Sequence, residues 1–137
     1  MTERRINVFF YGLFMDVEAL RAKGLQPSEE RLVSLPGFAL RIRERATLVP
    51  EANGQVYGVN MLLTHAEVDR LYSDPSVSAY RPEAVLTRLD DGSVVPALCF
   101  NLVNHPGAAE GNPQYATKLR ELAQRLQLPS NYVASIQ

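Results

Sequence analysis

The stretch Ile6–Met15, INVFFYGLFM, constrains the fold of this chain more than any other. Its first half is β-branched and aromatic, as a buried strand requires, and Tyr11-Gly12 precedes a helix-like segment that opens at Asp16. Because Gly12 has no Cβ, the backbone can turn there and approach a ligand closely. A strand, a glycine turn and a helix start can together form a nest of N–H groups for an anion or a developing oxyanion. The sequence therefore predicts that any functional site lies at this turn; the alternative is an ordinary buried first strand with a sharp exit.

Length and composition predict one globular domain over residues 1–137. Charged residues make up 21% of the chain, hydrophobic residues 46%, and the formal net charge is −1, so the chain can bury a core without disulfides or metal. The single cysteine, Cys99, excludes an intrachain disulfide, and its apolar neighbours predict a core position. The start of the chain lacks the long apolar segment of a signal peptide, and no apolar run is long enough to cross a bilayer. We therefore expect a cytoplasmic protein without a membrane partner.

Strand and helix signals along the chain predict an α+β fold. Asp16 and Gly24 mark the start and the end of a short helix, and Thr64 with Glu67 forms a capping-box pattern. Asn53-Gly54 predicts a hairpin turn into a long strand. Mostly antiparallel strands with helices inserted between them favour a curved or closed sheet. The expected strands are 6–11, 38–43, 47–50, 55–63, 83–89 and 94–103, and the expected helices follow Asp16, Thr64 and Asn112.

Histidines and arginines offer weaker signals of a site. His65 and His105 are far apart and have no carboxylate at ligand spacing, so we expect no metal; no glycine-rich phosphate loop is present, and we expect no cofactor. A Cys99–His105 nucleophile and base is a minor alternative, because a thiol within an apolar strand is typical of a core residue. Three arginines alternate along one expected strand, which indicates a solvated face rather than a nucleic-acid surface, with an anion-binding patch as the alternative. They are Arg41, Arg43 and Arg45.

Asp74 is the carboxylate with the strongest case for a chemical role. It follows the second expected helix in the irregular segment 73–80, with Pro75 next to it and Tyr80 at the end of the segment. A partly buried carboxylate at such a corner can act as a general acid or base, because burial raises its pKa toward the working pH. Tyr80 could line the same pocket. The alternative is an ordinary turn that ends a helix.

The order of these motifs resembles the γ-glutamylcyclotransferase-like (AIG2-like) family. Tyr11–Met15, YGLFM, resembles the family's Tyr-Gly-(Ser/Thr)-(Leu/Asn)-(Met/Leu) signature after its first strand. Gly54–Gly58 resembles its G-x-V-(Y/W)-G strand, Glu67–Tyr72 its (L/V)-D-x-L helix, and Tyr80 its tyrosine. Pro113–Tyr132 resembles its closing helix with (G/L)-L-P-x-x-Y. The match spans nearly the whole chain, and the combination is more specific than any single motif.

The resemblance implies a small mixed, mostly antiparallel β-barrel with surrounding helices and a pocket at the end of the first strand. In the family, amides of the Tyr-Gly loop hold the substrate's γ-glutamyl group. A glutamate after the middle helix moves the proton that lets the substrate's α-amine attack its own γ-carbonyl, which releases 5-oxoproline without a cofactor. For this chain the resemblance implies Asp74 as the acid or base and a small γ-glutamyl-type molecule as the partner. The implied substrate-binding residues are Tyr11, Gly12, Leu13, Phe14 and Tyr80.

The sequence departs from the family pattern at two positions. Asp74-Pro75 stands where the family has Glu-Gly, so the carboxylate is one methylene shorter, and the spacing to Tyr80 is one residue shorter. Leu13 replaces the usual Ser or Thr and removes a hydroxyl from the pocket wall. Glu83 offers a substitute carboxylate, but the neighbouring Arg81 and Pro82 favour a surface residue at a strand edge. A second hypothesis therefore stays open: a non-catalytic small-ligand-binding or interaction module on the same fold.

Overall fold

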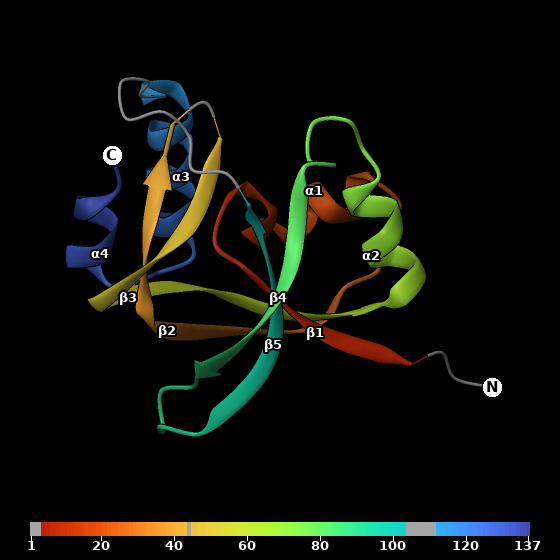
Figure 1. Ribbon diagram of the computed structural model, residues 1–137, viewed down its shortest axis with the longest axis horizontal. Helices are drawn as coiled ribbons and strands as arrows, with labels where there is room; N and C mark the ends of the chain where they lie inside the picture. The colour runs from red at the N-terminus through yellow and green to blue at the C-terminus, as the bar shows by residue number, and fades with distance from the viewer. Residues whose placement is uncertain (1–3, 44, 104–111) are drawn as a thin grey trace.

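The computed structural model describes residues 4–43, 45–103 and 112–137, which fold around a closed β-barrel (Figure 1). Its strands are β1 (Arg5–Phe10), β2 (Ser28–Ile42), β3 (Ala46–Thr64), β4 (Tyr80–Arg88) and β5 (Val94–Leu102). Around the barrel the order is β1-β3-β2-β4-β5. The β1–β5 pair is parallel and the other four pairs are antiparallel. The predicted small mixed, mostly antiparallel barrel is thus confirmed.

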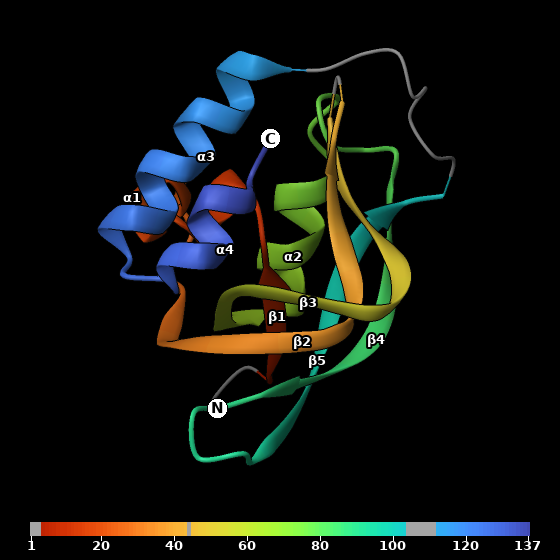
Figure 2. The same cartoon turned by 90° about the vertical axis from the view of Figure 1, so that its left-hand side faces the viewer.

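Helices cover the barrel on more than one side (Figures 1 and 2). They are the short 3₁₀ helix η1 (Leu13–Met15), α1 (Val17–Ala22), α2 (His65–Tyr72), α3 (Pro113–Arg125) and α4 (Ser130–Ser135). In both views α3 and α4 lie together, and in Figure 1 α2 lies on the other side of the molecule. No helix in the described part of the chain is long and apolar enough to span a membrane.

Apolar side chains from both the strands and the helices form the core. The largest of those that are fully buried include Phe9, Met15, Leu20, Leu25, Leu35, Met61, Leu63 and Leu119. Cys99 is fully buried in β5, as predicted, and burial raises the pKa of its thiol to about 12, against the opposing effect of a hydrogen bond with Asn101. A buried, protonated thiol is a poor nucleophile. His105, the other member of the alternative Cys-His pair, lies outside the described residues.

The predicted hairpin turn at Asn53-Gly54 is wrong. Both residues lie inside β3. The antiparallel strands β2 and β3 instead meet between Ile42 and Ala46, where the Arg43 N–H donates to the Arg45 carbonyl at 3.1 Å. The register between β2 and β3 shifts opposite Asn53-Gly54, so the extra residues of β3 form a bulge. A Cβ on Gly54 would lie 2.3 Å from the Phe38 carbonyl oxygen. The glycine therefore serves a close approach of two strands rather than a turn.

Side-chain caps begin α1 and α2 where the sequence predicts them. The Asp16 carboxylate accepts from the Glu18 N–H at 3.1 Å. Thr64 Oγ1 accepts from the Glu67 N–H at 3.1 Å, and Glu67 Oε1 accepts from the Thr64 N–H at 2.9 Å, which completes the capping box. These local bonds fix where α2 begins, and therefore which side chain its last turn presents to the barrel.

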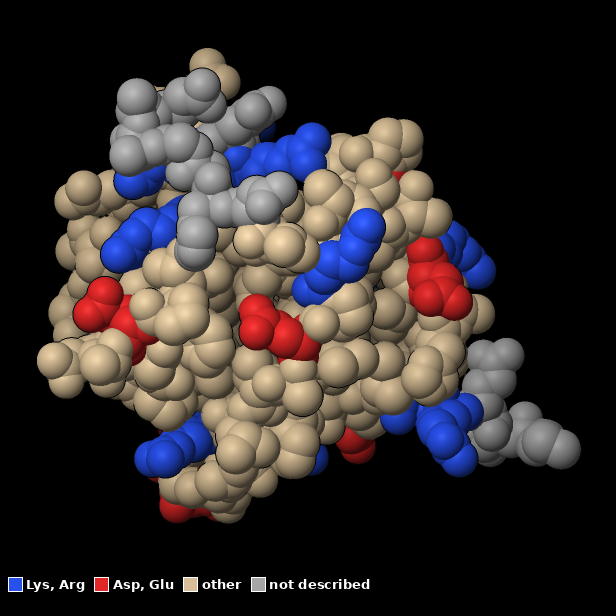
Figure 3. Space-filling model, in the orientation of Figure 1, with Lys and Arg blue, Asp and Glu red and all other residues tan. Residues whose placement is uncertain are grey.

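Charges of both signs are interspersed on the surface face shown in Figure 3. Lys and Arg side chains lie among Asp and Glu side chains there, without segregation of the two signs. This arrangement agrees with the small formal net charge of the chain.

Candidate functional site

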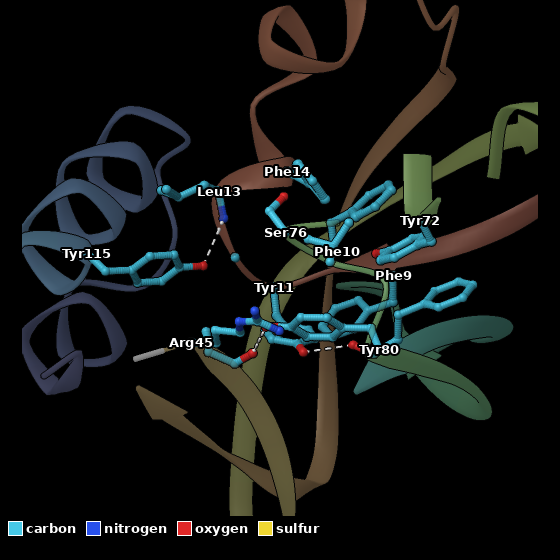
Figure 4. A pocket seen from close by; sticks show the side chains of 14 residues that line it. Phe9, Phe10, Tyr11, Leu13, Phe14, Arg45, Tyr72, Ser76, Tyr80 and Tyr115 are labelled. Carbon is cyan, nitrogen blue, oxygen red and sulfur yellow. Dashed lines mark hydrogen bonds between the residues drawn. The ribbon is translucent and has the colours of Figure 1, made fainter. Parts of the chain in front are cut away.

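A cavity of about 250 Å³ opens at the end of β1, where the sequence predicts the site (Figure 4). Residues from many parts of the chain line it: the turn after β1, the start of β3, the end of α2 and the following loop, β4, β5 and α3. The structure brings together every predicted binding residue: Tyr11, Gly12, Leu13, Phe14 and Tyr80. It also adds residues that the sequence patterns do not assign to the site, namely Arg45, Tyr72, Ser76, Val77, Phe100 and Tyr115.

The glycine turn forms the first turn of η1. The Gly12 carbonyl accepts from the Met15 N–H at 3.0 Å, and the amides that open such a turn have no acceptor within it. One of them is already used, because the Leu13 N–H donates to the Tyr115 phenol oxygen at 3.3 Å (Figure 4). The Phe14 N–H has no acceptor among the described residues. The turn therefore offers a ligand fewer free N–H groups than the predicted nest, because the Leu13 N–H is used and the Phe14 N–H is free among the described residues.

Tyr115 lies so close to residue 12 that only glycine fits there. A Cβ at Gly12 would lie 2.5 Å from the Tyr115 phenol oxygen, so we expect Gly12→Ala to lower the free energy of unfolding by about 1–2 kcal/mol. Tyr115→Phe removes the obstructing oxygen and should reduce that loss. Chemical denaturation of the two single variants and the double variant measures the coupling. Strictly additive effects would contradict this explanation of the glycine.

The lining phenols are uncharged hydrogen-bonding groups. Tyr11 Oη donates to the Phe100 carbonyl at 2.8 Å, and Tyr80 Oη donates to the Ala46 carbonyl. Burial raises the pKa of Tyr11 well above its ordinary value. Burial also raises the pKa of Tyr80 to about 12, although nearby Arg45 lowers it. Neither phenol can act as a base at neutral pH, and both hydroxyl protons are used within the protein.

The last residue of α2, Tyr72, projects into the cavity. Its ring stacks on Phe100, with centroids 3.9 Å apart at 13°, and meets Phe14 edge-on at 6.2 Å and 82°. Burial, together with the neighbouring Cys99 and Tyr80, raises the pKa of the Tyr72 phenol. The end of the middle helix therefore presents a neutral phenol to the cavity (Figure 4).

The structure does not bring Asp74 into this cavity. The side chain is exposed, and its carboxylate accepts from the Ser76 N–H at 2.9 Å and from the Ser76 hydroxyl at 2.7 Å. These bonds lower the pKa of Asp74 below its ordinary value of 3.8, which makes the carboxylate a weaker base. Glu83 is exposed on β4 and accepts from Asn101, and it does not line the cavity either. The position of Asp74 gives no support to its predicted role as acid or base.

Arg45 is the charged residue whose position the sequence patterns do not predict. Its spacing from Arg43 predicts a solvated strand face, but Arg45 lies directly before β3, half-buried, and lines the cavity. No carboxylate lines the cavity among the described residues. Nor do those residues include a cluster of three His, Cys, Asp or Glu side chains that could hold a metal ion. The described lining is thus aromatic and positively charged, and it offers no set of metal ligands.

The fold and the site together define a class of protein: a small closed β-barrel with a pocket at the end of its first strand. No family model and no curated protein matches the sequence. Among solved structures, the chain resembles a γ-glutamyl cyclotransferase (TM-score 0.81, 18% identity, 98% of this chain and 89% of that one). It also resembles an uncharacterised human protein (TM-score 0.83, 18% identity, 98% of this chain and 89% of that one). A mouse AIG2-like protein is similar too (TM-score 0.60, 14% identity, 93% of this chain and 86% of that one). At these identities the comparison establishes the fold: this chain has the γ-glutamylcyclotransferase-like fold.

Proposed function

We propose that this protein binds a small acyl molecule, of the size and chemistry of a γ-glutamyl amide, in the cavity at the end of β1. The observation that carries the proposal is the cavity of about 250 Å³ itself, located at the tyrosine–glycine turn. Aromatic walls supply apolar contact, while Arg45 and the Phe14 amide supply donors for an acyl or carboxylate oxygen. An apolar pocket with a few convergent polar groups is typical of small-molecule sites.

Binding without turnover is favoured because the described lining holds no base. Cyclisation of a γ-glutamyl amide requires a group that accepts a proton from the α-amine. Among the described residues, the titratable groups that line the cavity are phenols, whose pKa values are raised by burial, and the guanidinium of Arg45. Asp74, the predicted base, is exposed and does not line the cavity, and its carboxylate accepts from the hydroxyl of Ser76, which does line it. The second hypothesis drawn from the sequence, a binding module on this fold, therefore agrees best with the geometry.

γ-Glutamyl cyclisation is the second candidate, supported by the likeness of the whole fold to a γ-glutamyl cyclotransferase. In that reaction the α-amine attacks the γ-carbonyl, the ring C–N bond of 5-oxoproline forms, and the bond to the leaving amine breaks. One proton passes from the α-nitrogen to the leaving nitrogen. The reaction is intramolecular, so a pocket that holds the bent substrate contributes to the rate by orientation.

One experiment separates the two candidates. Binding of L-γ-glutamyl anilide is measured by calorimetry and release of 5-oxoproline by chromatography, for wild type, Asp74→Asn and Val77→Phe. We expect wild type and Asp74→Asn to bind equally without release, because Asp74 lies outside the cavity. Val77 lines the cavity and is half-buried, so Val77→Phe should weaken binding about tenfold or more by filling it.

The other outcomes are equally decisive. Absence of binding by wild type, across γ-glutamyl amides, γ-glutamyl dipeptides and related acyl amides, would refute the proposed function. Release of 5-oxoproline by wild type would establish the second candidate instead. If Asp74→Asn then abolished that release in a folded protein, Asp74 would be the acid or base that the sequence predicts.

A further inference from the structure

We propose that the preferred occupant of the cavity is an organic anion with an apolar, planar body and no ammonium group, held through its carboxylate by Arg45. This inference rests on the proposed function, since it names which small acyl molecules bind best. Three features of the cavity support it: a guanidinium without an ionic partner among the described residues, a described lining without a carboxylate, and aromatic walls.

Arg45 supplies a positive charge that the described residues do not neutralise. It lies directly before β3, half-buried, and is close enough to Tyr80 to affect the phenol electrostatically. The two ion pairs between described residues do not involve Arg45. By contrast, the neighbouring Arg43 guanidinium donates to the Ile42 carbonyl at 2.8 Å. A half-buried guanidinium without an ionic partner matches a carboxylate in both charge and geometry.

A ligand ammonium group would find no counter-charge in the described lining. The Asp74 carboxylate is exposed and engaged by Ser76, and Glu83 is engaged by Asn101; neither lines the cavity. An ammonium taken into the cavity would lose hydration and would also lie near Arg45. Aromatic faces attract cations, but the guanidinium opposes a second positive charge.

The hydrogen-bonding groups point to a ligand rich in acceptors. Tyr115 already accepts from the Leu13 N–H, so its hydroxyl proton remains to be donated. The Tyr72 hydroxyl has no partner among the described residues. With Arg45, these groups offer several donors to carbonyl or carboxylate oxygens, and no carboxylate in the described lining competes for them.

The walls fit a planar apolar group. Phe10 and Phe14 meet edge-on with centroids 6.1 Å apart, and Tyr72 stacks on Phe100, so flat ring faces and edges bound the space. A cavity of about 150 Å³ can hold benzene, so one of about 250 Å³ has room for one ring and a short acyl chain. A carboxylate at one end of such a molecule would reach Arg45 while the ring contacts the aromatic wall.

Three matched compounds test this inference by calorimetry. Glutaric acid monoanilide differs from L-γ-glutamyl anilide only by lacking the α-amino group, and its primary-amide analogue lacks the carboxylate charge. We expect the monoanilide to bind about tenfold tighter than either of the other two compounds, because only it combines a free anion with no ammonium. Arg45→Met should weaken binding of the monoanilide about tenfold, so that its advantage disappears. The affinity for the primary amide should stay unchanged.

Arg43→Met is the matched control, because Arg43 carries the same charge two residues away and does not line this cavity; it should change neither affinity. Equal or tighter binding of L-γ-glutamyl anilide than of the monoanilide would overturn the inference while leaving the proposed function intact. Undiminished binding of the monoanilide to a folded Arg45→Met variant would overturn it too. If none of the three compounds binds wild type, the proposed function itself fails.

Discussion

Replacing Gly58 with alanine is expected to lower the free energy of unfolding by about 3–5 kcal/mol, which is a large part of the stability of a domain this size. Gly58 lies in β3, where β1 passes over it: a Cβ there would lie 2.3 Å from the Phe10 carbonyl oxygen and 2.7 Å from Phe9 Cε1. Phe9 is 1% exposed, and Phe10 pairs with Val59 across the two strands. Neither obstacle can move without breaking the β1–β3 ladder or the core, so the barrel must open.

Urea denaturation followed by circular dichroism measures the loss, and Gly92→Ala is the control. Gly92 has a φ of +87°, but beyond its chain neighbours no atom of the described residues lies within 4 Å of where the methyl group of an alanine would be. Its replacement therefore carries only the backbone cost of about 1–2 kcal/mol. A Gly58→Ala variant as stable as Gly92→Ala would contradict the close-approach explanation. The test also bears on the site, because the Phe10 carbonyl lies one residue before the tyrosine–glycine turn.

Elements whose ends are fixed by local hydrogen bonds were predictable from the sequence. Asp16 caps α1, and Gly24, at φ +87°, follows its end. Thr64 and Glu67 bond to each other across the first turn of α2. These signals depend on neighbours within four residues, so no knowledge of the tertiary fold is needed to interpret them.

Strand lengths and register were less predictable, because they depend on partners far along the chain. Asn53-Gly54 carries a strong hairpin signal, yet pairing with β2 continues on both sides of it. Similarly, Pro36-Gly37 suggests a turn, but β2 runs from Ser28 to Ile42 through both residues. A closed barrel requires long strands that bend, and glycines and bulges that resemble turns in the sequence provide the bends.

The part of the site formed by one continuous segment could be predicted from the sequence. The residues that the fold brings to the site from distant positions could not. The tyrosine–glycine turn is one continuous segment, and it does line the cavity. Arg45 and Tyr115 reach the same cavity from positions that only the barrel and α3 bring close. Tyr72 had a usable signal, because it follows the inward-facing Val68 by four residues and therefore shares its helix face. The prediction of Asp74 rested on its place after the second helix and on its match to the family's glutamate, and neither records the direction of a side chain in an irregular loop.

Glu67 joins two segments that frame this half of the molecule, and Glu67→Gln is expected to lower the free energy of unfolding by about 1.5–3 kcal/mol at pH 7. Oε1 accepts from the Thr64 N–H at 2.9 Å and Oε2 from the Gln26 N–H at 2.6 Å. The carboxylate therefore fixes the start of α2 and also holds the chain between α1 and β2. The glutamine amide keeps one acceptor oxygen but replaces the other with a donor, which faces an N–H group across a short distance. Chemical denaturation of the wild type and the variant measures the difference.

The same contacts predict how that difference depends on pH. Burial raises the pKa of Glu67, but the hydrogen bonds from Thr64 and Gln26, together with nearby Arg5, outweigh it, so the folded-state pKa lies below the ordinary value of 4.5. A lowered folded-state pKa means that the stabilisation is fully present above pH 4.5 and is lost as the pH falls through the lowered pKa. The gap between wild type and Glu67→Gln should thus be largest at neutral pH and shrink in acid. Glu18→Gln is the control: Glu18 pairs with Arg21 on the surface, with its side chain 74% exposed, and its loss should cost less than about 1 kcal/mol. A gap for Glu67→Gln that stayed constant from pH 7 into acid would show that the ionised carboxylate does not stabilise this junction.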